Sequence, residues 1–303
     1  MYFARRVLPL IFLMLATRAA MADEPLVWKF TSGDEHHYRM TQLVDMQMKL
    51  SETGPNLDTG AEQLIDLTWK VEAVDEQGHA KIRQTVDRTR MKMQAPGQPT
   101  LKYDSDSEDD PAGFAAMLTP LYRAMIEHAF SMTMSPRGEI TNVEIPEQLS
   151  LAMKNVPGID KKDEMFSSDG FKTLVQNNSL VLPKPADLSP GYQWSKNTSM
   201  ESKQFGSSAF TMTYRYLGPY EVKGKEIEAF SVSMKMEFGK TIAGVELEIL
   251  DQKSAGEILF DREAGRLESS KLQQDVELQV TVAGQPMNQK LTQKFTFERI
   301  AKP

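Results

Sequence analysis

Pairs of methionines separated by a single residue are the pattern in this sequence that comes closest to site chemistry. In a β-strand, residues two apart lie on the same face, so both thioethers of such a pair would face the same way. Soft thioethers bind Cu(I), and methionines also line adaptable apolar surfaces or fill the core. Because the chain has 4 His and no Cys to complete a copper site, we interpret these residues mainly as core, with an apolar ligand groove as the functional alternative. The pairs are Met46/Met48, Met91/Met93, Met132/Met134 and Met234/Met236.

An acidic run from Asp104 to Asp110 is a second candidate, because carboxylates are ligands that Ca²⁺ prefers. The run departs from the calcium-loop template: Asp109 stands where the turn-forming glycine belongs, and Ala115 where the bidentate glutamate belongs. His36 and His37 are adjacent, so in a strand they point to opposite faces and cannot chelate one metal without a kink. We therefore predict no metal site and interpret the acidic run as an exposed loop before a helix.

Catalytic motifs are missing from the sequence. It contains no H-E-x-x-H, G-x-S-x-G, G-x-G-x-x-G or Walker-type loop, and no pair of carboxylates can be selected for general acid–base catalysis. We therefore predict a protein that is not an enzyme, with no catalytic residues and no cofactor.

The first 22 residues have the pattern of a secretory signal peptide. Arg5 and Arg6 precede an apolar run from Val7 to Ala16, and Ala20-Met21-Ala22 provides a small-residue cleavage site. This apolar run is far shorter than the ~20 residues that span a membrane. We therefore predict cleavage near Ala22, export to a periplasmic or extracellular location, and no membrane-spanning segment in the mature chain.

The charge balance of the chain argues against one class of partner. There are 35 basic and 42 acidic side chains, and cleavage removes Arg5, Arg6 and Arg18 but no acid, which leaves 32 against 42, a net charge of −10. A chain this acidic is a poor electrostatic partner for polyanions such as nucleic acid or an anionic membrane, so we predict no nucleic-acid partner. The absence of Cys excludes disulfides, and a chain of 303 residues is long enough to fold on a buried core alone.

Period-2 alternation of apolar residues dominates the rest of the chain and predicts β-strands. The alternation that begins at Ile65 slips its phase before Met91, which predicts a bulge or a bend near Asp87–Arg90. Ser135-Pro136-Arg137-Gly138 predicts a type I turn, and Ala283-Gly284-Gln285-Pro286 predicts the loop of a C-terminal hairpin. Further strands are predicted around residues 210–216, 230–238, 245–249, 258–260, 276–282 and 291–297.

Helical spacing is confined to the middle of the sequence. Asp110–Phe130 predicts a helix that Pro120 should bend or interrupt, and shorter helices are predicted at Pro146–Asn155 and Phe171–Gln176. The proline-containing stretch 177–191 is the candidate linker. We expect two parts that form either separate domains or one continuous fold. The expected organisation is a signal peptide (1–22), an N-terminal β-meander with a helical insertion (23–178) and a C-terminal β-meander (179–303).

Several short motifs resemble an uncharacterised family of bacterial secreted β-rich proteins, a domain-of-unknown-function family. The resemblance covers most of the mature chain and implies an exported β-rich protein, with no catalytic residues to transfer. The motifs are Leu26-Val27-Trp28-Lys29-Phe30, Gly33-Asp34, Tyr38-Arg39-Met40-Thr41, Lys102-Tyr103-Asp104-Ser105, Met134-Ser135-Pro136-Arg137-Gly138-Glu139, Leu259-Phe260-Asp261, Gly265-Arg266-Leu267 and Val282-Ala283-Gly284-Gln285.

The expected architecture is mainly β: one or two strongly curved antiparallel sheets, with two related β-meanders as one option, and a central helix packed on the sheet. Such a sheet has an apolar face that must be covered, closed or used for binding. We expect this face to bind a lipid, another apolar ligand or an acyl-bearing partner; the alternative is a structural or interaction module that meets an envelope protein. The candidate ligand-binding residues are Trp69, Met91, Met93, Phe210, Met212, Met234 and Met236.

Overall fold

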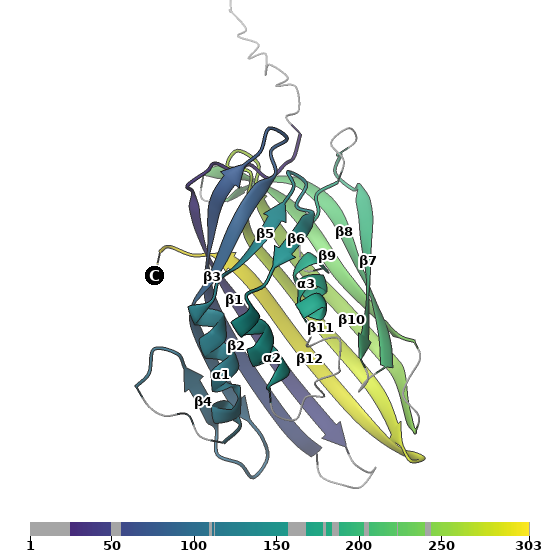
Figure 1. Cartoon of the computed structure of the whole chain (residues 1–303). Helices are drawn as coiled ribbons and strands as arrows, with labels where there is room; N and C mark the ends of the chain where they lie inside the picture. The colour runs from purple at the N-terminus through teal and green to yellow at the C-terminus, as the bar shows by residue number, and fades with distance from the viewer. Residues whose placement is uncertain are drawn as a thin grey trace, which may run out of the picture.

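Twelve β-strands and three helices make up the described part of the chain (Figure 1). The structure is a computed structural model, and the predicted signal peptide lies outside the residues it describes, as do Asp109 and Asp110 of the acidic run. The described residues are 25–49, 56–108, 111, 113–156, 168–177, 180–183, 188–202, 206–222, 224–239 and 244–302.

The strands differ greatly in length between the edges of the sheet and its centre. Those of the N-terminal part are β1 (Glu35–Lys49), β2 (Asn56–Val74), β3 (Ala80–Gln94), β4 (Leu101–Asp104), β5 (Phe130–Met134) and β6 (Ile140–Glu144). Those of the C-terminal part are β7 (Gln193–Ser202), β8 (Gly206–Val222), β9 (Lys225–Phe238), β10 (Val245–Asp261), β11 (Arg266–Val282) and β12 (Gln285–Arg299).

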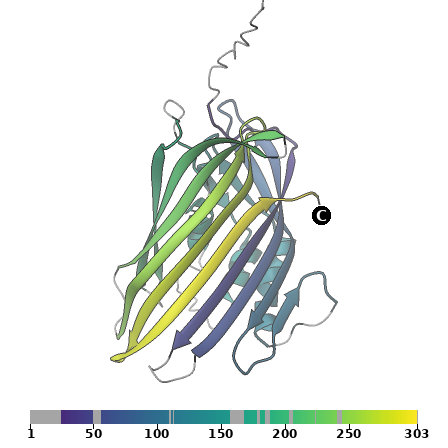
Figure 2. The ribbon, with the colours of Figure 1, turned by 180° about the vertical axis from the view of Figure 1, so that it is seen from behind.

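All of these strands belong to one antiparallel sheet, in the order β6-β5-β3-β2-β1-β12-β11-β10-β9-β8-β7, with β4 paired to β3. β1 pairs with β12 from Tyr38 opposite Arg299 to Lys49 opposite Asn288, so the first and last described strands meet at the centre of the sheet. The sheet is curled but not closed; Figure 2 shows its convex side, and the helices lie on the concave side. The predicted mainly β, antiparallel, curved architecture is confirmed.

Local irregularities in the sheet follow the sequence signals. Asp66 pairs with Arg88 and Leu67 pairs with Val86, which leaves Asp87 as the extra residue of the predicted bulge. The last hairpin turns at Ala283 and Gly284, whose φ angles of 51° and 79° suit a tight two-residue turn between twisted strands. Both predictions are confirmed.

A single apolar cluster joins the two arms of the sheet at one end, which we call the core end. Its buried side chains come from β2, β3, β5 and β6 on one arm and from β8, β9, β10 and β11 on the other, together with Trp28 and Leu182 from the segments before β1 and β7. The backbone N–H of Trp28 donates to the Pro136 carbonyl at 2.7 Å, and that of Leu182 donates to the Arg137 carbonyl at 2.7 Å. Both segments are therefore fixed to the β5–β6 hairpin.

The β5–β6 turn requires glycine at its last position. Gly138 has φ of 88°, and a Cβ there would lie 2.0 Å from the Leu180 carbonyl oxygen and 2.6 Å from Trp28 Nε1. Its N–H donates to the Ser135 carbonyl at 2.8 Å, which confirms the predicted turn. The hairpin backbone thus touches both packed segments directly, and no larger residue permits this approach.

Three helices cover part of the concave face: α1 (Gly113–Glu127), α2 (Glu147–Lys154) and α3 (Ser168–Asn177). α1 packs on β3 and β4, and α2 packs on α1. Pro120 lies inside α1, and the helix continues past it, so the helix is not interrupted at this proline. The two shorter predicted helices are confirmed as α2 and α3.

Candidate functional site

The apolar face of the sheet extends past the core end toward the opposite end of the strands, which we call the far end. On β9, Phe230 and Val232 are buried in the core, and the same alternation continues with Met234 and Met236. These two methionines are half-buried. Because alternate residues share one face of a strand, the concave face remains apolar beyond the filled core.

Two cross-strand pairs form a compact apolar group on β8 and β9. Phe210 lies opposite Met236, and Met212 lies opposite Met234. All four side chains are half-buried, and Met212 packs against the main core. We call these four residues the β8–β9 patch. The structure therefore brings together four of the seven predicted ligand-binding residues.

Beside this patch, the regular backbone pairing between β9 and β10 stops. The ladder between β9 and β10 covers only residues 228–232 of β9. Beyond it, Gln252 uses its side chain as a substitute for backbone pairing: its Oε1 accepts the Met236 N–H at 2.8 Å and its Nε2 donates to the Met236 carbonyl at 3.0 Å. Ser254 Oγ likewise accepts the Met234 N–H at 3.0 Å. We call this region the β9–β10 seam.

Trp69 lies in an aromatic group nearer to the core end. Its ring centroid is 5.0 Å from that of Tyr38 and 6.0 Å from that of Phe297. Its indole Nε1 donates to Gln84 Oε1 at 2.7 Å, which satisfies the polar atom of a largely apolar ring. Trp69 thus borders the concave face at its core end and is separate from the β8–β9 patch.

Met91 and Met93 lie on the opposite arm of the sheet, beneath α1. Met91 is buried with Tyr103 and Tyr122, whose rings stack with centroids 4.9 Å apart, and Met93 packs against this cluster. The Tyr122 hydroxyl donates to Met91 Sδ at 3.4 Å. In this structure α1 covers the Met91 side chain, so the predicted set divides into three separate places.

The central strands contribute apolar side chains that the sequence-based site did not include. Met46 on β1 lies opposite Leu291 on β12, and Phe295 on β12 lies opposite Leu272 on β11; all four are half-buried. The alternation within each strand is visible in the sequence. The pairing of the first strand with the last, which places them in one surface, has no local sequence signal.

Buried charged groups gather at the core end. The Glu228 side chain is 3% exposed, accepts a 2.5 Å hydrogen bond from the Tyr216 hydroxyl and lies 2.5 Å from Arg262 Nε. Burial and then the Glu228 carboxylate raise the pKa of Tyr216. Lys225 pairs with the buried carboxylate of Asp261 in the same region. Each buried acid therefore has a local cation.

The described part of the acidic run is bound by arginine. Arg88 donates to both oxygens of Asp104, at 2.9 and 2.6 Å, and its Nε lies 3.2 Å from Asp106. The hydrogen bonds from Arg88 lower the pKa of Asp104. Among the residues that the structure describes, no group of three His, Cys, Asp or Glu side chains is arranged to hold a metal ion.

Comparison with protein families matches residues 77–267 to a family of unknown function, DUF6263. This chain belongs to DUF6263. The matched DUF6263 region begins in the β2–β3 turn and ends at the start of β11, so it includes all three helices, the β8–β9 patch and the β9–β10 seam. Comparison of the DUF6263 chain with curated proteins finds no match.

Solved structures resemble the DUF6263 chain only distantly. A structure on lipid–protein interactions in lipovitellin has 12% identity and a TM-score of 0.44, covering 90% of this chain but 26% of that one, so this chain spans about a quarter of it. DynF from the dynemicin biosynthesis pathway of Micromonospora chersina has 8% identity and a TM-score of 0.21, with 93% and 88% covered. The β domain of the Bordetella autotransporter BrkA has 10% identity and a TM-score of 0.22, with 88% and 99% covered. Within the described residues, no helix combines the length and apolar character needed to cross a membrane.

Proposed function

We propose that this protein is a non-enzymatic, exported carrier that binds a lipid, another apolar ligand or the acyl chain of a partner on the concave face of its sheet. The observation that carries this proposal is the extension of the apolar face beyond the core end. The alternation that fills the core end continues toward the far end as half-buried side chains on β8, β9, β12 and β1 and as the buried Val276 and Leu278 on β11, past one polar pair, Gln274 and Gln293. Burial of such surface against a ligand contributes roughly 25 cal/mol per Å².

The dimensions of this face suit an elongated apolar ligand. From Val232 to Phe238, β9 continues for six residues past the core, and a strand rises ~3.3 Å per residue, so the face extends roughly 20 Å. This length is comparable with that of a fatty acyl chain. Methionines in the β8–β9 patch can adjust their rotamers to ligands of different shape, which favours a class of apolar molecules over one compound.

The alternative is an interaction module that meets an envelope protein through a sheet edge. β7 (Gln193–Ser202) is an edge strand that pairs with β8 and, within the described residues, with no other strand. An unpaired strand edge can accept an extended segment of a partner through backbone hydrogen bonds. This alternative predicts binding of a protein segment that is insensitive to changes in the β8–β9 patch.

The carrier function is tested by native mass spectrometry of the purified protein together with titration of an apolar fluorescent dye. We expect a copurified lipid or dye binding in the wild type, and a loss of affinity of about tenfold or more in Met234→Gln/Met236→Gln, because about 1.4 kcal/mol of lost apolar contact gives tenfold. The matched control is Lys235→Gln/Glu237→Gln, which alters exposed side chains of the same strand that pair at 2.7 Å.

The control should bind the dye with wild-type affinity, and thermal unfolding should show that both variants are folded. A folded wild type with neither copurified ligand nor dye binding would contradict the carrier function. Equal loss of affinity in both variants would also contradict it, because the control leaves the concave face unchanged.

A further inference from the structure

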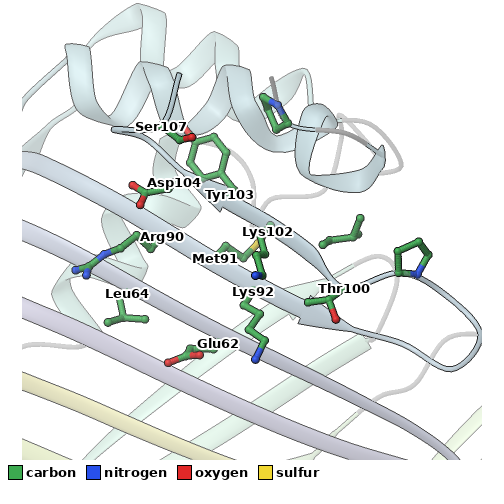
Figure 3. A pocket seen from close by; sticks show the side chains of 13 residues that line it. Glu62, Leu64, Arg90, Met91, Lys92, Thr100, Lys102, Tyr103, Asp104 and Ser107 are labelled. Atoms are coloured by element: carbon green, nitrogen blue, oxygen red, sulfur yellow. The ribbon is translucent and has the colours of Figure 1, made fainter. Parts of the chain in front are cut away.

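A pocket of about 620 Å³ lies at the β3–β4 hairpin, apart from the β8–β9 patch (Figure 3). Its volume is within the range of small-molecule sites, about 300–1,000 Å³. The lining combines charged side chains with apolar ones. The apolar members are Leu64, Met91, Pro99, Leu101, Tyr103 and Pro111.

Two lysines face each other across this hairpin. Lys92 on β3 lies directly opposite Lys102 on β4, both side chains are exposed, and both line the pocket. Like charges directly opposite each other in a sheet are destabilising. Figure 3 shows the two side chains leaving their strands toward the same side. The hairpin therefore concentrates positive charge at one point of an acidic protein.

The next cross-strand pair on the same face of the hairpin, Arg90 and Asp104, shows how charges are compensated elsewhere in this protein. Arg90 lies opposite Asp104, yet Arg90 binds Asp66 at 2.7 Å and Asp104 receives two hydrogen bonds from Arg88. Both Arg90 and Asp104 therefore have an ion-pair partner of opposite sign. In contrast, neither lysine has an ion pair or hydrogen bond with any described residue.

The acids at the pocket leave the lysine charge uncompensated. Glu62 on β2 lies directly opposite Lys92, and it is the pocket-lining acid that remains among the described residues once Asp104 is assigned to Arg88. Glu62 forms no ion pair with either lysine within 4.0 Å. Among the pocket-lining residues that the structure describes, one carboxylate therefore stands against two ammonium groups, which favours a ligand that brings negative charge.

We propose that Lys92 and Lys102 bind a phosphate group, and that the organic part of the ligand packs on the apolar part of the lining that shares their face of the sheet, where Leu64 lies opposite Arg90. Two adjacent ammonium groups match a phosphate, which offers several acceptor oxygens and up to two negative charges. A bare phosphate would fill only a small part of the pocket, so the volume and the apolar lining indicate a phosphate ester. The lysines and Met91 leave opposite faces of β3, so this site is independent of the concave face and of the carrier function.

The phosphate can come from an anionic lipid headgroup or from free phosphate, and titration calorimetry distinguishes the two. The probes are dihexanoyl phosphatidic acid below its micelle concentration, inorganic phosphate, and dihexanoyl phosphatidylcholine, whose headgroup is neutral overall. We expect phosphatidic acid to bind at least tenfold more tightly than either of the others. Raising the salt concentration should weaken that binding, because it screens the charge of the lysines.

The variant Lys92→Gln/Lys102→Gln tests the residues themselves. We expect it to lower the affinity for phosphatidic acid at least tenfold and to leave Tm unchanged or raised, because it removes a repulsion. The control Lys271→Gln/Lys294→Gln changes the net charge equally, at two exposed lysines of β11 and β12, and should bind as the wild type does.

Three outcomes would overturn the proposal. If no probe binds, the pocket is not a phosphate site. If the variant and its control lose affinity equally, the effect is one of net charge and not of this lysine pair. If inorganic phosphate binds as tightly as phosphatidic acid, the apolar lining has no role and the organic part of the proposal fails. Dye binding to the concave face should be the same in the variant as in the wild type.

Discussion

Glu228 shows how single residues determine whether the core end can be formed. Its carboxylate is almost fully buried between the Tyr216 hydroxyl and the Arg262 guanidinium. A buried charge costs several kcal/mol unless it is paired and hydrogen-bonded, so each member of this group depends on the others. Glu228, Tyr216 and Arg262 therefore add little net stability together, but the fold loses stability when one of them is removed.

The dependence of Glu228 on its partner can be measured with Arg262→Gln. We expect this substitution to lower the free energy of unfolding by about 2–4 kcal/mol, because it leaves a buried carboxylate without its cation. Chemical denaturation provides the measurement, and the double substitution Glu228→Gln/Arg262→Gln should recover part of the loss. Arg215→Gln is the control, since this arginine is exposed on β8, and its effect should stay within about 0.5 kcal/mol. A loss no greater than that of the control would contradict this role.

His36 should make stability depend on pH near neutrality. Burial, followed by the nearby Arg266, lowers the pKa of His36 below its ordinary value of 6.5. As the pH falls through 6.5, the unfolded chain takes up a proton before the folded protein does, so the stability of the fold decreases from that point down to the folded-state pKa. We expect Tm to fall between pH 7.5 and 5.5 in the wild type, and to fall less in His36→Gln. Identical slopes in both proteins would exclude His36 as the cause.

At the scale of elements, the β9–β10 seam separates two kinds of pairing in one sheet. At the core end β9 and β10 share a regular ladder, whereas beyond it Gln252 and Ser254 supply side-chain hydrogen bonds to β9. Such bonds hold two strands at a greater separation than a ladder does, and each depends on one side chain. The β9–β10 seam is therefore a part of the sheet in which a single substitution can weaken the contact between two strands.

Gln252→Ala should weaken this seam selectively. It leaves the N–H and carbonyl of Met236 without these partners, and an unmet hydrogen bond costs about 1–3 kcal/mol. We expect a lower Tm and faster amide hydrogen exchange at Met234 and Met236, while exchange in the β9 ladder stays slow. Gln279→Ala is the control, because this glutamine makes only an exposed contact with Asn288. Uniformly faster exchange across the whole sheet would contradict a local role.

The sequence predicts elements well where one strand or turn carries its own signal. The bulge at Asp87, the turn at Gly138 and the short helices all follow from local chemistry. What lies between elements is not predictable in this way: β4 has too few residues for alternation to be visible, so the opposition of Lys92 and Lys102 could not be anticipated. For the same reason, nothing in the Met-x-Met spacing distinguishes a methionine beneath α1 from one on the β8–β9 patch.

At the scale of the whole molecule, the pairing of β1 with β12 determines how the sheet holds together. These two strands are the first and last among the described residues, and they lie at the centre of the sheet, not at its edges. The predicted N-terminal and C-terminal meanders are thus joined along a full strand. Contacts of such large sequence separation are costly in loop-closure entropy and form slowly.

Removal of β12 should therefore prevent the remaining chain from folding, and not merely shorten the sheet by one strand. A chain that ends after Val282 loses the strand between β1 and β11, together with the half-buried Leu291 and Phe295. Domains are typically stable by only about 5–15 kcal/mol, so a loss of strand pairing on both sides of β12 together with its apolar contacts should be enough to unfold this one. We expect no cooperative thermal unfolding by circular dichroism, whereas a chain ending after Ile300 should unfold as the full chain does. A truncated chain with near-native Tm would show that the arms fold separately.

The central position of β1 and β12 also sets an order of events during synthesis. Strand β1 leaves the ribosome early, but the neighbour that completes its pairing, β12, is made last. Until Arg299 has emerged, the nascent chain has two unfinished arms and no continuous sheet. We therefore expect the continuous sheet to form only once β12 is available to pair with β1 and β11.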